Sequence, residues 1–202
     1  MLSPIEQCRG NMVRVRNLGG LHQAFDQQTT PAVDLTDLLR AQIVMIVSAL
    51  DHYIHEITRV GMLEVYDGVR PQTNAFLRFQ VTMSATMTGI SKSSENDWFD
   101  REIRDKHGHQ AFQHPDNIAK AVRLFSSCEL WRSVASELNL TDQDVKNRLR
   151  AIVNRRNQIV HESDLDPSYP GTENRWPISS GDVTSTLDFI QDVCEAIHTV
   201  VN

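Results

Sequence analysis

Apolar residues recur at three- and four-residue steps along much of the chain, which is the period of an amphipathic α-helix. The longest such stretch runs from Asp34 to about Val60, and its apolarity on all sides predicts a central, buried helix. A second stretch, from about Asp182 to Val200, carries an apolar seam with coiled-coil spacing. The members of this seam are Val183, Leu187, Ile190, Cys194, Ile197 and Val201. The pattern predicts an α-rich fold whose C-terminal seam packs either within the chain or against a second copy.

The N-terminal residues carry a helix start signal followed by helix-breaking glycines. Ser3 suits an N-cap and Pro4 the first helical position, so a helix should begin there. Gly10 and the Gly19–Gly20 pair should interrupt it. We therefore expect a separate N-terminal helical segment over residues 1–33, followed by a helical domain over residues 34–202.

Residues 70–137 should form accessory helices and loops. A short helix is expected over residues 71–84, after Pro71, and a loop over residues 84–94. Three further short helices are predicted from capping residues and apolar periodicity, within residues 94–107, 114–127 and 129–138.

Composition limits the class of protein. The chain has 202 residues, of which 40 % are apolar and 23 % charged, as expected for one globular domain with an appended segment. Nine glycines and seven prolines are too few for a loop-rich β architecture. The net charge of −6 means that contact with a nucleic acid requires a local basic patch.

The cysteines and the apolar runs bear on the compartment. Cys8, Cys128 and Cys194 are odd in number and far apart, which favours a reduced, intracellular protein without a disulfide framework. The N-terminus lacks the pattern of a signal peptide. The longest apolar run, Ile43–Leu50, is too short to span a bilayer. We therefore expect a cytoplasmic protein with no membrane partner.

The run "TDQDVKNRLRAIVNRRNQIVH" begins at a capping-type residue, Thr141, and predicts a helix that ends near His161. At about 100° per residue, Arg156 lies at the centre of its apolar stripe. Asn157 and His161 lie together on one flank, four residues apart. A charge in the middle of an apolar stripe is costly unless it is paired or faces a wet cleft.

Two interpretations of Arg156 follow from this spacing. In the first, it is a buried arginine paired with a carboxylate on another helix, such as Asp51 or Glu56. In the second, Arg156, Asn157 and His161 meet at the rim of a groove and act on a phosphodiester. Histidine can transfer a proton near neutral pH, and arginine can stabilise charge on phosphate. Asparagine can orient either the histidine or the substrate. Such a set needs no metal.

The same helix is locally basic. Acidic residues in its first turn and basic residues later complement the helix dipole, which is a sufficient explanation for some of these charges. The residues that we assign to RNA binding are Lys146, Arg150 and Arg155.

Two segments resemble a known family. "RNQIVH", Arg156 to His161, is similar to the R-[polar]-x-x-x-H signature of the HEPN superfamily. "SALDHYIHEI", Ser48 to Ile57, and "LRAIVNRRNQIVHESD", Leu149 to Asp164, resemble its RiboL-PSP-HEPN branch. This similarity extends over roughly residues 35–200.

The resemblance implies an all-α fold, a HEPN-like up-down four-helix bundle with accessory helices. It also implies a homodimer whose two signatures form one composite site. Arg156 would then contact phosphate, Asn157 would occupy the polar position, and His161 would either perform acid–base work or hold the scissile phosphate. The implied activity is a metal-independent endoribonuclease of a toxin or anti-phage defence type that leaves 2′,3′-cyclic phosphate ends.

The resemblance leaves other roles open and suggests partners besides RNA. An antitoxin or sensor protein encoded on another chain could restrain such an enzyme. The alternative is a non-catalytic HEPN-like module that binds RNA, a nucleotide or a partner protein through the same cleft. A third reading is a purely structural dimer in which Arg156 forms a buried ion pair.

Histidines elsewhere are weaker candidates. His52 and His55, with Asp51 beside them, could bind zinc, but no third ligand cluster accompanies them, so we expect a supporting or auxiliary role for all three. The segment "HGHQAFQH", residues 107–114, is more typical of a helix end with surface histidines than of a metal site. We expect no metal and no cofactor.

Overall fold

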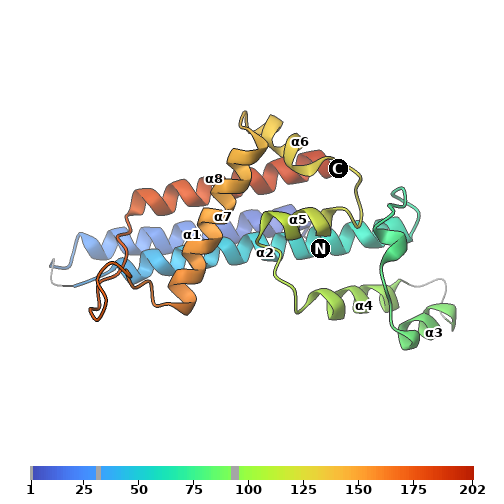
Figure 1. The fold of residues 1–202 in the computed structure, drawn as a ribbon, viewed down its shortest axis with the longest axis horizontal. Coiled ribbons are helices and arrows are strands. Elements are labelled where there is room, and N and C mark those ends of the chain that lie inside the picture. Colours follow the sequence, from blue (N-terminus) through green and yellow to red (C-terminus); the bar gives the residue numbers. More distant parts are fainter. Residues whose placement is uncertain (1, 31–32, 92–95) are drawn as a thin grey trace.

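The computed structural model describes residues 2–30, 33–91 and 96–202. Within these ranges every regular element is helical, apart from one isolated bridge between Leu165 and Arg175, so the prediction of an all-α fold is confirmed. Three long helices lie along the long axis of the molecule, and a fourth crosses over them (Figure 1). The long helices are α1 (Pro4–Asp26), α2 (Thr36–Tyr66) and α8 (Ser180–Val201), and the crossing helix is α7 (Asp142–His161).

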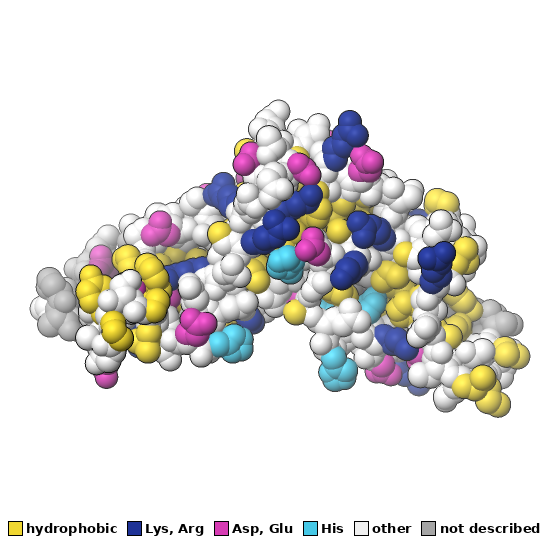
Figure 2. Space-filling model, viewed as in Figure 1, with side chains coloured by type: hydrophobic (Ala, Val, Ile, Leu, Met, Phe, Trp, Pro, Cys, Tyr) yellow, Lys and Arg dark blue, Asp and Glu magenta, His cyan; other side chains and the backbone are white. Residues whose placement is uncertain are grey.

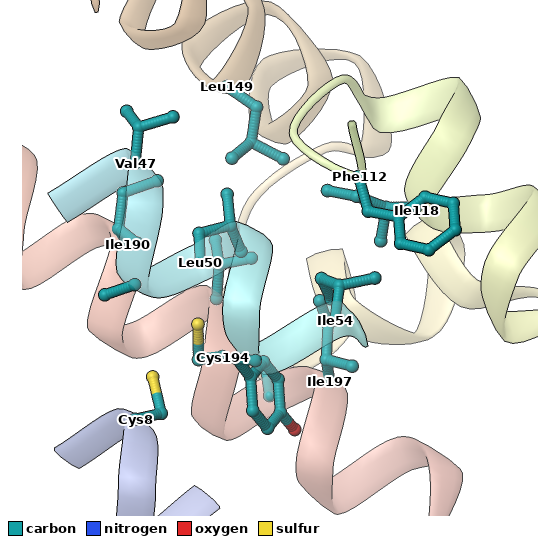
Figure 3. Close-up of a cluster of buried hydrophobic side chains, with 14 of the residues drawn as sticks. Cys8, Val47, Leu50, Ile54, Phe112, Ile118, Leu149, Ile190, Cys194 and Ile197 are labelled. Atoms are coloured by element: carbon teal, nitrogen blue, oxygen red, sulfur yellow. The ribbon is translucent and has the colours of Figure 1, made fainter. Parts of the chain in front are cut away.

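Helix α2 forms the centre of the fold, as its all-round apolarity predicts. It contacts α1, α7 and α8, and it has buried residues along its whole length. Figure 3 shows side chains of this core meeting there, among them Cys8 of α1, Leu50 of α2, Leu149 of α7 and Ile190 of α8. The helix ends at Tyr66, six residues beyond the predicted end at Val60.

The apolar seam of α8 packs inside the chain. All six of its residues are buried, and α8 contacts α1, α2 and α6. Of the two arrangements that the sequence left open, the structure shows the one within a single chain. The seam therefore gives no support to a dimer.

Helix α1 is continuous from Pro4 to Asp26, so the predicted interruption at Gly10 and Gly19–Gly20 is wrong. A glycine inside a helix costs about 1 kcal/mol relative to alanine. Burial of one face of α1 against α2 and α8 offsets this cost, since the helix contributes Ile5, Cys8, Met12 and Val15 to the main core. This packing joins residues 4–26 to the core of the helical domain.

Accessory helices connect α2 to α7. They are α3 (Met83–Ser91), α4 (Asp97–His107), α5 (Pro115–Val122) and α6 (Leu130–Glu137). The last three agree with the predicted short helices. A second, smaller apolar cluster, around Met62, Phe99 and Ile103, packs the end of α2 against α4.

The predictions for residues 71–91 are wrong. Residues 71–82 contain only the 3-10 turn Phe76–Arg78, where the predicted helix should be. The Thr73 hydroxyl donates to the Arg123 carbonyl at 2.8 Å and accepts from the Phe76 N–H at 3.0 Å, which holds this segment against α5. Helix α3 occupies residues 84–91 of the predicted loop, and the rest of that loop, residues 92–94, lies outside the described residues.

Candidate active site

The sequence of α7 explains where the helix begins and ends. The Thr141 hydroxyl accepts from the Asp144 N–H at 3.1 Å, which is the predicted N-cap. At the other end, the N–H groups of Glu162 and Asp164 both donate to the Gln158 carbonyl, at 2.9 and 3.0 Å. Ser163 and Asp164 have φ values of 55° and 59°, so the chain turns sharply away from the helix axis after His161.

Arg156 lies on the apolar face of α7, as the helical period predicts. Val145 and Leu149 on the same face are fully buried, and Arg156 itself is half-buried. Its Nη1 donates to the Asn157 Oδ1 at 3.2 Å. Its Nε is buried without a hydrogen-bond partner among the described residues, so the guanidinium retains an unused donor.

Asn157 and His161 lie one helical turn apart on the neighbouring flank. Asn157 is half-buried, whereas His161, the last residue of α7, is exposed. The three residues therefore form an open, polar end of the helix, in which Arg156 and Asn157 are in direct contact and His161 faces solvent. We call Arg156, Asn157 and His161 the Arg156 site.

Of the two interpretations of Arg156, the one in which it pairs with a carboxylate on another helix, such as Asp51 or Glu56, is wrong. The Asp51 Oδ1 accepts from the Phe112 N–H at 2.6 Å, which anchors the segment before α5. Glu56 pairs with Arg59 at 2.8 Å. Among the described residues, no ion pair involves Arg156. Asp51 therefore holds the segment before α5, and Glu56 pairs within α2 and lies 3.6 Å from Arg104 of α4.

The buried ion pairs at this end of α7 involve the preceding residue, Arg155. Asp164 is completely buried, and its carboxylate lies between Arg155 Nη1 and Arg40 Nε, each 2.6 Å away. Arg40 comes from the first turns of α2, where its side chain is only 8 % exposed. Both guanidinium groups also donate to the Trp176 carbonyl, at 3.0 Å from Arg40 and 3.3 Å from Arg155. We call Arg40, Arg155 and Asp164 the Asp164 cluster.

This cluster joins three parts of the chain. It connects the start of α2, the end of α7 and the irregular segment that leads to α8 through one buried carboxylate. Burial lowers the pKa of Arg155 from its ordinary value, with Arg40 acting in the same direction and Asp164 opposing both. Because Asp164 is three residues after His161, the cluster fixes the position of the open polar end. Our sequence reasoning missed Asp164 and Arg40, although an arginine within an apolar helix such as α2 is itself a signal of buried pairing.

The α2 histidines are held by other partners. The His52 Nε2 lies 3.3 Å from the Gln7 Oε1 of α1. The His55 Nε2 lies 3.1 Å from the Gln110 carbonyl, and its ring packs on Phe112 with the centroids 4.5 Å apart. These contacts do not bring His52, His55 or Asp51 to Arg156, and their auxiliary role stays a prediction.

The histidines of residues 107–114 have separate environments. His107 is buried, and burial, with a smaller effect of His55, lowers its pKa to about 4, so it is neutral near pH 7. His109 is exposed, and the His114 ring accepts from the Asp116 N–H at the start of α5. Within the described residues, no three His, Cys, Asp or Glu side chains are arranged to hold a metal ion.

The three basic residues assigned to RNA binding differ in their surroundings. Lys146 pairs with Asp142 at 2.9 Å on the flank of α7, and Arg150 lies 3.9 Å from Asp116 of α5. Arg155 instead points into the Asp164 cluster. Lys146 and Arg150 are thus available at the surface, while the guanidinium of Arg155 is engaged inside the fold.

The helices of the described residues include none that is both long and apolar enough to cross a membrane. Comparison with curated proteins and with solved structures finds no match. Comparison with family models gives a match to RiboL-PSP-HEPN over residues 14–202, which covers almost the entire chain and includes α2, α7 and α8. The chain therefore belongs to the RiboL-PSP-HEPN family.

Proposed function

We propose that the protein is a metal-independent endoribonuclease whose active site includes Arg156, Asn157 and His161. The observation that carries this proposal is the composition of the open end of α7. A guanidinium with an unused donor, an amide in contact with it and an exposed imidazole lie within two turns of one helix. Membership of the RiboL-PSP-HEPN family supports the same reading, since the resemblance assigns these positions to RNA cleavage.

The proposed reaction is an internal transesterification. The ribose 2′ oxygen attacks the adjacent phosphorus, the bond from phosphorus to the 5′ oxygen breaks, and a 2′,3′-cyclic phosphate and a 5′ hydroxyl result. One proton leaves the 2′ hydroxyl and one reaches the departing 5′ oxygen, and an imidazole such as His161 can perform such transfers near neutral pH. Arg156 would stabilise the charge that develops on the phosphate oxygens, and Asn157 would orient the guanidinium.

We further propose that a second copy of the chain completes the site. Arg156 is half-buried, and beyond its hydrogen bond to Asn157 it has no ion-pair partner among the described residues, so its guanidinium is free to pair with a group on a second copy. Apolar side chains near the end of α7 and in the segment that follows it are exposed, with Val160 at 46 %, Leu165 at 44 % and Tyr169 at 55 %. Burying such side chains against a symmetric partner would be favourable. The toxin or anti-phage role, and an antitoxin or sensor partner, belong to this proposal through the family resemblance.

Cleavage of RNA in EDTA tests the proposal. Purified wild type should cut RNA and leave cyclic phosphate ends. His161→Ala should cut it 10² to 10⁴ times more slowly, roughly the contribution of one acid–base group. His109→Ala is the matched control, because His109 is an exposed histidine on the segment after α4 and should retain full activity.

Two other outcomes would change the conclusion. If wild type binds RNA but leaves it intact, the alternative of a non-catalytic module replaces the nuclease. If His161→Ala and wild type cleave equally, the chemistry lies elsewhere in the chain. Expression in cells gives a second readout, since growth arrest relieved by His161→Ala and not by His109→Ala is expected of a toxin.

A further inference from the structure

A groove lies beside the first turns of α7, away from the Arg156 site. It is lined by residues 72–78, by the end of α5, by the start of α6 and by α7 at Asp142 and Lys146. Its volume is about 1050 Å³, at the upper end of the range of small-ligand pockets. It is open to solvent, so an extended chain could lie along it.

The groove is locally basic in an acidic protein. Four of its side chains are cationic and two are acidic, whereas the whole chain has a net charge of −6. The cationic residues are Arg78, Arg123, Arg132 and Lys146. Figure 2 shows Lys and Arg side chains gathered on the face formed by α5, α6 and α7, with single acidic groups between them.

The acidic residues of the groove only partly compensate its positive charge. Glu129 lies 3.1 Å from Arg132 and Asp142 lies 2.9 Å from Lys146. The Arg132 and Glu129 side chains are 85 % and 73 % exposed, so their attraction is weak in water and can be replaced by a phosphate. Arg123 is exposed, and within the described residues it forms no ion pair.

One flank of α7 connects this groove to the Arg156 site. Relative to Lys146, the side chains of Arg150, Asn157 and His161 point within about 60° of the same direction. The rise of about 1.5 Å per residue places His161 about 22 Å from Lys146 along the helix axis. A polyanion that occupies the groove can therefore follow α7 past Arg150 to the proposed site of cleavage.

We propose that the groove binds the sugar–phosphate backbone of single-stranded RNA on one side of the scissile bond. This inference rests on the proposed function and adds a second contact region to it. Arginine and lysine recognise regularly spaced phosphates without regard to base sequence. Trp131, the aromatic side chain of the groove, is only 7 % exposed, so it cannot act as a stacking platform for bases. The groove would thus contribute affinity for long RNA and leave the choice of base to the Arg156 site.

The test uses variants of exposed groove residues in the full-length protein. Arg123→Gln and Arg132→Gln are combined, because both side chains are at the surface and neither is in the core. The matched control is Arg14→Gln, an exposed arginine of α1, which packs on α2 and α8. Both variants are made in a protein that carries His161→Ala, so that the RNA remains intact during the measurement. The His161→Ala protein without further changes is the reference.

Binding is measured by fluorescence anisotropy with a labelled single-stranded RNA over a series of salt concentrations. Each lost phosphate contact should lower the slope of log K against log salt by about 0.7 for a single strand. The double groove variant should therefore lose about 1.4 of the slope, with weaker binding at every salt concentration, while Arg14→Gln retains both. Equal slopes and affinities for all proteins would overturn the proposal, as would the absence of RNA binding by His161→Ala itself.

Cleavage assays with His161 present distinguish failure of the groove from failure of the nuclease. The groove variant should cut a long RNA more slowly than wild type and cut a dinucleotide at the same rate. Equal slowing on both substrates would contradict a separate binding region. If wild type cuts neither substrate, the nuclease proposal fails, but the change in the salt slope still decides whether the groove binds RNA.

Discussion

The end of α7 carries two polar regions that differ in almost every physical respect. The Asp164 cluster is closed, with a carboxylate of zero exposure held between two guanidinium groups. The Arg156 site is open, with an exposed imidazole and a guanidinium whose partner within the chain is a neighbouring amide. Arg155 and Arg156 are adjacent in sequence, yet one belongs to each region. A charged side chain at a helix end thus stabilises the fold when its partners are buried with it. When they are not, the side chain remains able to contact a molecule outside the chain.

The largest effect should come from removing the shared carboxylate. Asp164→Ala leaves Arg40 and Arg155 facing each other without the buried counter-charge, with only the exposed Asp37 3.6 Å from Arg40, and an arginine cannot escape by losing its proton. Removing one partner from a buried ion pair costs about 3–5 kcal/mol, so the free energy of unfolding should fall by that amount. Urea denaturation followed by circular dichroism measures it.

Asp188→Ala is the control for this experiment. Asp188 pairs with Arg16 at 3.2 Å, but the two side chains are 56 % and 47 % exposed. An exposed pair contributes about 0–1 kcal/mol, so this variant should be nearly as stable as wild type. If both aspartate variants lost the same small amount, the closed character of the Asp164 cluster would be contradicted.

A smaller loss is expected for Arg155→Ala. Arg40 still contacts Asp164 at 2.6 Å in this variant, so the carboxylate keeps one of its two partners. Loss of a hydrogen bond to a charged group costs about 1.5–3 kcal/mol. Because Arg155 also donates to the carbonyls of Trp176 and Pro177, residues 164–178 should become easier for a protease to cut.

A neighbouring arginine of α7 provides the reference for that loss. Arg150 lies 3.9 Å from Asp116 on the open flank, so Arg150→Ala should change the free energy of unfolding by less than about 0.5 kcal/mol. The double variant of Arg155 and Asp164 should be less unstable than the sum of the two single variants, because the residues share one interaction. Additive losses would show that Arg155 stabilises the fold by some other contact.

Local sequence signals were sufficient for much of the fold and for the Arg156 site. Ser3 and Thr141 cap their helices as predicted, and the helical period alone places Arg156, Asn157 and His161 at one end of α7. Both depend on residues within a few positions of one another. Helix α1, in contrast, runs through its glycines because distant helices bury its face. Helix α3 was missed although its start is local, since the Thr82 hydroxyl accepts from the Ala85 N–H at 3.2 Å.

The Asp164 cluster could not be predicted in this way. Asp164 and Arg40 are 124 residues apart, and nothing in the local sequence of either residue indicates the other. Helical geometry correctly placed Arg156 on the apolar face, but it could not show that this guanidinium is only half-buried. The paired arginine is Arg155, and its partner, the Asp164 carboxylate, lies beyond the end of the helix.

Among the residues of the two polar regions, the smallest change in stability is expected for Arg156→Ala, next to the residue whose loss matters. Its Nη1 bonds to the neighbouring Asn157, and its buried Nε has no partner in the described structure, so truncation leaves no charge unpaired. The free energy of unfolding should change by no more than about 1 kcal/mol, while RNA cleavage should fall by about 10²-fold or more, as for loss of a donor to a developing oxyanion. Arg156→Lys should keep the stability of wild type and recover little of the activity, because a lysine cannot replace the bidentate guanidinium. A loss of stability as large as that of Arg155→Ala would instead make Arg156 a structural residue, and the two regions would then be one.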